Sequence, residues 1–173
     1  MTNPNYQEFT PEQIPEHQGK NFIVKVVAGE FDKTKGGVTY SHPIEYLVFK
    51  MQPGSSTEHT LKPNWNGFIA VSDGEVEVNS NKIGLHHGAI FKKQTEPAPL
   101  QLTSEKGATF LMVSGLPINE SIARSGPFVM NTQQEIREAY EDYSSARNGF
   151  EDRIGWKSQI AKLIKDAIDS DED

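Results

Sequence analysis

The sequence of 173 residues contains no cysteine. This absence excludes a disulfide framework, a thiol nucleophile and a cysteine-ligated metal site. The first 20 residues contain no apolar run of the kind that a signal peptide requires. No stretch approaches the roughly 20 apolar residues of a membrane span. We therefore expect a cytoplasmic or nuclear protein that does not act in a membrane.

Positive charge is also scarce, because 17 lysines and arginines face 24 aspartates and glutamates, for a net charge of −7. Such a chain repels phosphates and anionic lipids, so we expect no direct contact with nucleic acid. Apolar residues without glycine make up 35%, below the roughly 45–50% of an average globular chain, a figure that also counts glycine. The shortage lies mostly at the two ends, which leaves a normal core for one domain in the middle.

The middle of the chain contains short apolar and β-branched runs, each bounded by turn residues. Between two of these runs stands Asp73-Gly74, a strong hairpin signal because glycine readily adopts a positive φ. Repeated short strands with frequent turns predict an antiparallel sandwich or barrel rather than parallel βαβ units. The seven predicted strands are Phe22–Ala28, Ile44–Met51, Gly67–Val71, Glu75–Val78, Ala89–Lys92, Leu100–Thr103 and Ala108–Ser114.

The two ends read differently. Residues 1–20 resemble a linker, with one short helical turn expected where Thr10 precedes Pro11. A helix is predicted over 132–148, because Thr132 and Glu135 fit a capping box and apolar residues then recur with helical period. Asn148-Gly149 is expected to close it. Residues 157–173 predict an amphipathic helix followed by an acidic tail.

The segment from Gly115 to Ile136, GLPINESIARSGPFVMNTQQEI, closely resembles the signature of the pirin family. That family has a Gly-x-Pro-Leu-x-Glu-Pro-Ile stretch leading into Gly-Pro-Phe-Val-Met-Asn-Thr and a helix. Trp65–Phe68 and Asp73–Glu75 resemble the central hairpin of the same family. The resemblance covers about residues 4–159 and begins at the linker between the family's two cupin domains.

The resemblance implies that residues 21–156 form the C-terminal cupin domain of the family. The fold class that follows is mainly β: an RmlC-like antiparallel β-barrel, or jelly roll, with C-terminal α-helices. In the pirin family the iron lies in the other, N-terminal cupin, held by three histidines and one glutamate, and the flavonol-cleaving dioxygenase activity of some members needs that iron. The resemblance therefore implies the fold without implying the activity.

Cupin metal sites need two histidines two positions apart on one strand, together with a glutamate and a further histidine. His59 occupies the first histidine position, and Leu61 stands at the second. The glutamate position falls near Asn66 or Gly67, and the last histidine position near Phe91. We therefore predict no catalytic residue, no bound metal and no cofactor, with His59 as the only residue in place to ligate.

We expect several other polar side chains to lie at the surface. A charged residue on an antiparallel strand usually lies on the solvated face, so we expect Glu45, Glu58, Glu75 and Glu77 there. His17 is expected to be exposed within the linker.

Trp65 and Asn66 allow two interpretations. They can lie with His59 at the mouth of the barrel and grip a small ligand. Alternatively, Trp65 plugs the barrel and Asn66 bonds within a turn.

The function predicted from the sequence is a non-catalytic, pirin-like cupin module with a protein-interaction or regulatory role. Its partner would be another protein or a second copy, bound through the face that packs against the second cupin in full-length relatives. The pirin family's role as a nuclear cofactor of transcription factors makes a regulatory partner a reasonable expectation. The alternative is a small cupin enzyme, a dioxygenase or isomerase with an atypical metal site, or a small-molecule-binding barrel. A degenerate copy without retained function also stays open.

Overall fold

A computed structural model describes residues 6–158 and 160. The chain divides into two compact units, Met1–Ile118 and Asn119–Asp173, and each is described by itself. The predicted second helix and the acidic tail lie outside the described residues, apart from residues 157, 158 and 160. Within the described part, no helix has the length and apolar character needed to cross a membrane.

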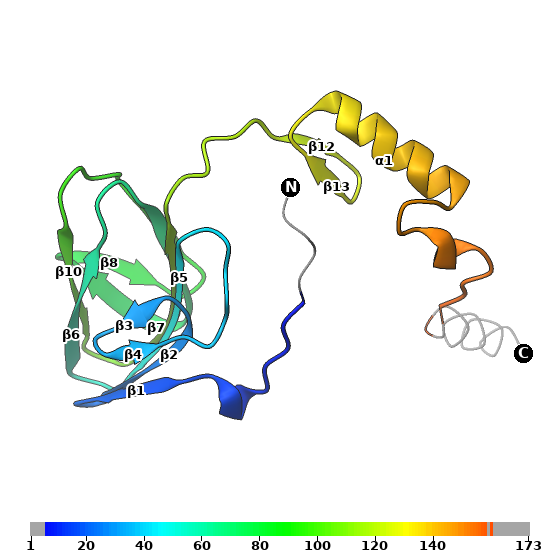
Figure 1. Ribbon diagram of the computed structural model, residues 1–173. Helices are drawn as coiled ribbons and strands as arrows, with labels where there is room; N and C mark the ends of the chain where they lie inside the picture. The colour runs from blue at the N-terminus through cyan, green and yellow to red at the C-terminus, as the bar shows by residue number, and fades with distance from the viewer. Residues whose placement is uncertain (1–5, 159, 161–173) are drawn as a thin grey trace, which may run out of the picture. The chain divides into compact units, whose positions relative to one another are not determined.

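The first unit is a nearly closed antiparallel β-barrel (Figure 1), as the sequence predicted. One nine-stranded sheet runs in the order β1-β2-β5-β11-β7-β10-β6, and β8 and β9 both pair with β7. Its strands are β1 (Glu16–Gly19), β2 (Phe22–Ala28), β5 (Ile44–Met51), β6 (Ser55–Leu61), β7 (Asn66–Val78), β8 (Asn81–Gly84), β9 (Gly88–Phe91), β10 (Ala98–Ser104) and β11 (Ala108–Gly115). A short hairpin of β3 (Glu30–Phe31) and β4 (Thr34–Lys35) lies outside this sheet.

The barrel core follows from the alternation of side chains along the strands. In β2 and β11 every second residue is buried, and the residues between them are partly exposed. The inward residues of neighbouring strands pack together, and the rings of Phe49 and Phe110 stack with centroids 4.7 Å apart. The core is therefore built from the period-2 pattern that predicts these strands.

The predicted hairpin at Asp73-Gly74 is wrong, because both residues lie inside the continuous strand β7. The register of β7 against β11 shifts beside them: Val71 faces Phe110 and Asp73 faces Thr109, so Ser72 is an extra residue. Such a β-bulge bends a strand. The first half of β7 pairs with β9 and β11, and the second half with β8 and β10. The turn signal thus marks the corner at which one strand passes from one side of the barrel to the other.

Residues Glu16–Gly19, which the sequence analysis placed in a linker, form strand β1 and pair with β2. The short helical turn expected at Thr10 is present as a 3₁₀ turn over Pro11–Gln13. Polar strands at a sheet edge carry little hydrophobic signal, because one face and one edge remain in water. This explains why apolar periodicity did not reveal β1.

The second unit contains the hairpin β12 (Ala123–Ser125) and β13 (Phe128–Met130), the helix α1 (Gln133–Ser145) and a 3₁₀ turn over Glu151–Arg153. The predicted capping box is confirmed: Glu135 N donates to Thr132 Oγ1, and Thr132 N donates to Glu135 Oε2. The helix ends at Ser145, before the expected Asn148-Gly149 stop, because its C-cap Ala146 adopts a left-handed conformation with φ of 49°. Its buried residues, Ile136 and Ala139, lie on the predicted apolar face.

Gly74 generates a stability prediction, because its φ is 70° and a Cβ there would overlap the carbonyl oxygen of Gly107. Gly74→Ala should lower the free energy of unfolding by at least about 2 kcal/mol. Gly84→Ala is the matched control, since a Cβ at Gly84 meets no atom within 4 Å, and it should change stability by no more than about 0.5 kcal/mol. Urea unfolding curves measure both. Equal stability of the two variants would show that the corner does not constrain the barrel.

Candidate functional site

The candidate site lies on the inner face of the barrel, where four neighbouring strands align one residue each. Glu45 of β5 faces Ser114 of β11, Ser114 faces Gly67 of β7, and Gly67 faces Phe91 of β9. Cross-strand partners share a face of the sheet. This row therefore places a carboxylate, a hydroxyl, a glycine and an aromatic ring side by side inside the barrel.

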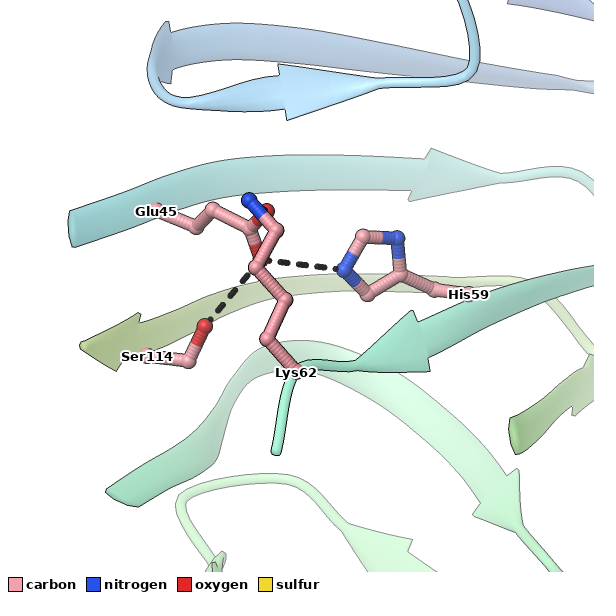
Figure 2. Close-up of polar contacts among 4 residues, drawn as sticks. All are labelled: Glu45, His59, Lys62 and Ser114. Atoms are coloured by element: carbon pink, nitrogen blue, oxygen red, sulfur yellow. Dashed lines mark hydrogen bonds and ion pairs between the residues drawn. The ribbon is translucent and has the colours of Figure 1, made fainter. Parts of the chain in front are cut away.

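Glu45 is the centre of this site, and its side chain is only 1% exposed. Lys62 Nζ lies 2.7 Å from Glu45 Oε1, and His59 Nε2 lies 3.2 Å from Glu45 Oε2. Ser114 Oγ donates to Oε2 at 3.2 Å (Figure 2). A buried carboxylate is costly unless it is paired and hydrogen-bonded. Here three side chains from β11, from β6 and from the residue directly after β6 satisfy both oxygens.

These contacts keep Glu45 ionised inside the barrel. Burial alone raises the pKa of a carboxyl group, because it disfavours the charged form. The hydrogen bonds from His59 and Lys62, together with their charges, outweigh burial, and the pKa of Glu45 lies below its ordinary value. The cluster therefore holds a negative charge balanced by a lysine.

Next to the cluster lies a cavity of about 470 Å³, lined by Glu45, His59 and Lys62 together with aromatic and acidic side chains. The His59 ring stacks on Phe31, with centroids 5.6 Å apart and an angle of 17°. His17, which was expected to be exposed, also lines this cavity and is only partly exposed. Its ring stacks against Phe22, because β1 pairs with β2 and brings it against the barrel.

Lys62 is the first residue after β6, and its side chain is exposed, at 46%. The ammonium lies 4.6 Å from the centroid of the Trp65 ring, within the range of a cation–π interaction. Trp65 itself is buried, at 8% exposure. The lysine thus bridges a buried carboxylate and a buried indole ring.

The three binding residues predicted from the sequence do not form one site. His59 contacts Glu45, and Trp65 reaches the same cluster only through Lys62. Asn66 is exposed and lines a different cavity, of about 940 Å³, beside Phe68 and Val113. The structure therefore joins two of these residues and separates the third.

Glu45 is buried inside the barrel, which corrects the expectation that it lies on the solvated face. Its strand reads IEYLVFKM, and Glu45 has the same parity as the buried residues Leu47, Phe49 and Met51. That parity is a signal in the sequence that could have placed Glu45 inside the barrel. Its three partners lie 14 to 69 residues away along the chain, and no local pattern indicates them.

The residues present do not fit the iron site that the cupin fold implies. Leu61 is buried at 1% exposure in the hydrophobic core, and Gly67 and Phe91 carry no donor atom. His59 meets Glu45 here, and Lys62 already contacts Glu45 Oε1. Among residues 6–158 and 160, no group of three histidine or carboxylate side chains is close enough to hold a metal ion.

The Glu45 carboxylate yields a pH prediction. Because its pKa is lowered by folding, it stabilises the fold above its unfolded-state pKa of about 4.3, and this contribution is lost as the pH falls through the lower folded value. Glu45→Gln should cost about 3 kcal/mol at pH 7, since it leaves Lys62 and His59 without their carboxylate. The difference from the wild type should shrink below about pH 4.

Urea titrations at pH 7 and pH 3.5 measure this difference. Glu58→Gln is the matched control, because Glu58 is an exposed carboxylate that lines the same cavity, and it should change stability by no more than about 0.5 kcal/mol. A cost for Glu45→Gln that is the same at both pH values would contradict the ionised cluster.

Comparison with known proteins identifies the fold. A family model described as the pirin C-terminal cupin domain matches residues 46–149. Pirin-1 of Arabidopsis thaliana is 36% identical over 155 residues, which are 87% of this chain and 54% of that protein. Human pirin is 34% identical over 164 residues, 92% of this chain and 56% of that protein. The chain spans about half the length of the curated relatives it matches.

Solved structures agree with this assignment. The crystal structure of quercetin 2,3-dioxygenase from Acinetobacter baumannii superposes with a TM-score of 0.75 at 30% identity, covering 82% of this chain and 50% of that one. A Geobacillus kaustophilus protein gives a TM-score of 0.65 at 22% identity, covering 69% of this chain and 50% of that one, and supports the fold alone. The predicted cupin-type barrel is confirmed, and the chain belongs to the pirin family.

Proposed function

We propose that this chain is a non-catalytic cupin module that binds a protein partner through the outer face of its barrel sheet, in a regulatory role. The observation that carries this proposal is a row of apolar side chains across four strands of that face. The interior cluster also supports the proposal. Its Glu45 carboxylate is already hydrogen-bonded and paired by side chains of this chain, so it does not need a metal or a ligand.

The apolar row follows directly from the register. Tyr46 of β5 faces Val113 of β11, Val113 faces Phe68 of β7, and Phe68 faces Ile90 of β9. Ile90 is 86% exposed, Phe68 42% and Tyr46 36%. These residues alternate with the inward row that contains Glu45, so they point out of the barrel.

A second apolar row reinforces the first. Val48 of β5 faces Leu111 of β11, which faces Ala70 of β7, and all three are partly exposed. An antiparallel sheet that borders water usually has polar residues on its outer face. Two adjacent apolar rows therefore support the proposal of an interaction surface on this face.

The charges on this face indicate the kind of partner. The outward positions of β1, β2, β5, β9, β11 and of β7 as far as Asp73 carry four charged residues, Glu16, Lys25, Lys50 and Asp73. Glu16 pairs with Lys25 at 3.3 Å, and Lys50 and Asp73 both face Thr109, so the face has no net charge on a chain of net charge −7. A protein partner with a largely apolar contact and few charges complements it.

A small-molecule-binding barrel, including an enzyme with an atypical metal, is the second candidate. The cavity of about 470 Å³ beside His59 and Lys62 favours it, because it joins polar groups to aromatic walls. A related structure is that of a quercetin 2,3-dioxygenase. We rank this function second because the residues of this cavity do not fit a cupin metal site.

The interaction surface is tested first by site-specific cross-linking. A photo-crosslinking amino acid at position 90 of the full chain should capture a different protein in cells, and the same amino acid at Leu85 serves as the control. Leu85 is also an exposed apolar residue, at 47%, in the turn after β8. Cross-links from position 90 only to copies of the same chain would replace the proposed partner with a homodimer.

Affinity for the captured partner gives the quantitative prediction. Ile90→Asp should weaken binding at least about tenfold, because it places a charge in the desolvated contact. Leu85→Asp should leave the dissociation constant within about twofold, and both variants should keep the wild-type melting temperature since both positions are exposed. Unchanged affinity for Ile90→Asp would overturn the proposed surface.

Sedimentation of the chain alone, at micromolar concentrations, should show a monomer.

A further inference from the structure

We propose that the ammonium group of Lys62, rather than a metal ion, balances the charge of the buried Glu45 carboxylate inside this barrel. The stability of the fold is therefore independent of divalent cations. This inference concerns the inner face of the strands. It does not depend on the interaction surface proposed above, which lies on their outer face.

The first argument is the geometry of the carboxylate. Lys62 Nζ is 2.7 Å from Oε1, while Oε2 receives His59 and Ser114, each at 3.2 Å (Figure 2). A metal ion binds a carboxylate through the same lone pairs. It would therefore compete with Lys62 for the Glu45 carboxylate and be repelled by the neighbouring ammonium.

The second argument is that the position of the lysine is supported. Trp65 N donates to the Lys62 carbonyl oxygen at 3.3 Å, closing a tight turn directly after β6. The same turn places the buried Trp65 ring 4.6 Å from Nζ. A cation between a carboxylate and an aromatic face is attracted to both. Lys62 thus contacts two buried groups rather than extending freely into solvent.

The third argument is that packing fills the places where other ligands would lie. Leu61 belongs to the hydrophobic core. At Gly67, an added Cβ would lie 3.0 Å from both Phe91 Cδ2 and Ser114 Cβ, which is too close for a longer, ligating side chain. Phe91 packs against the same core. Packing therefore occupies the expected ligand positions, and the buried Glu45 carboxylate has its own cation in Lys62.

A double-mutant cycle tests the balance of charge. Lys62→Met keeps the apolar stem and removes the charge, and it should lower the melting temperature by about 10 °C, because it leaves a buried charge unpaired. The Lys62→Met/Glu45→Gln double variant lacks that unpaired charge. Its melting temperature should therefore fall by much less than the sum of the decreases for the two single variants. Lys62→Arg should retain most of the stability.

Lys82→Met is the matched control, because Lys82 forms an exposed pair with Glu75 at 3.6 Å. Its melting temperature should stay within about 2 °C of the wild type. Strict additivity in the cycle, or a loss for Lys62→Met no larger than for Lys82→Met, would overturn the proposal.

Metal dependence is measured on the same proteins. Wild-type melting should not change by more than about 1 °C with EDTA or with 1 mM Zn²⁺. Destabilisation of the wild type by EDTA would show that a metal, rather than Lys62, balances Glu45. These measurements need no protein partner, so their failure is distinguishable from failure of the interaction surface.

Discussion

The ion pair between Glu45 and Lys62 is the constraint on which the interior of this barrel depends. A carboxylate inside a β-barrel destabilises the fold unless both oxygens are satisfied. Here Lys62 and His59 come from one strand and the turn after it, and Ser114 comes from another strand, so the barrel must close for the carboxylate to be satisfied. The charge is stable only in the folded arrangement, and the ionised cluster in turn requires the correct register of β5 against β11.

The same four strands also form the surface that we assign to partner binding. Glu45, Ser114, Gly67 and Phe91 align on the inner face, and the next residues along each strand align on the outer face. A register shift by one residue would exchange the two rows. The register that satisfies the buried carboxylate therefore also exposes the apolar row that includes Ile90.

The relationship to pirins and to a quercetin dioxygenase concerns the barrel, and a fold can be kept while the chemistry of its site changes. In this domain the interior retains a polar cluster at the end of the strands. Its donors are a lysine, one histidine and a serine around one carboxylate. Such a set stabilises a charge but offers no group of ligands for a metal. The protein-binding role that we propose depends instead on the outside of the barrel, where apolar side chains are exposed.

The sequence by itself determined the strands with strong alternation, such as Phe22–Ala28 and Ile44–Met51, the capping box at Thr132 and the pirin family. These features are local, because side-chain period and helix capping involve residues only a few positions apart. The parity of Glu45 was also visible in its strand.

Only the tertiary structure decided what Glu45 contacts and how β7 continues through Asp73-Gly74. A positive φ at glycine is compatible with either a hairpin or a bulge, and the pairing of β7 with β11 selected the bulge. Lys62 and Ser114 reach Glu45 because distant strands are paired in one register. Long-range pairing of this kind depends on the whole barrel, which is why no segment of the sequence could reveal the ion pair.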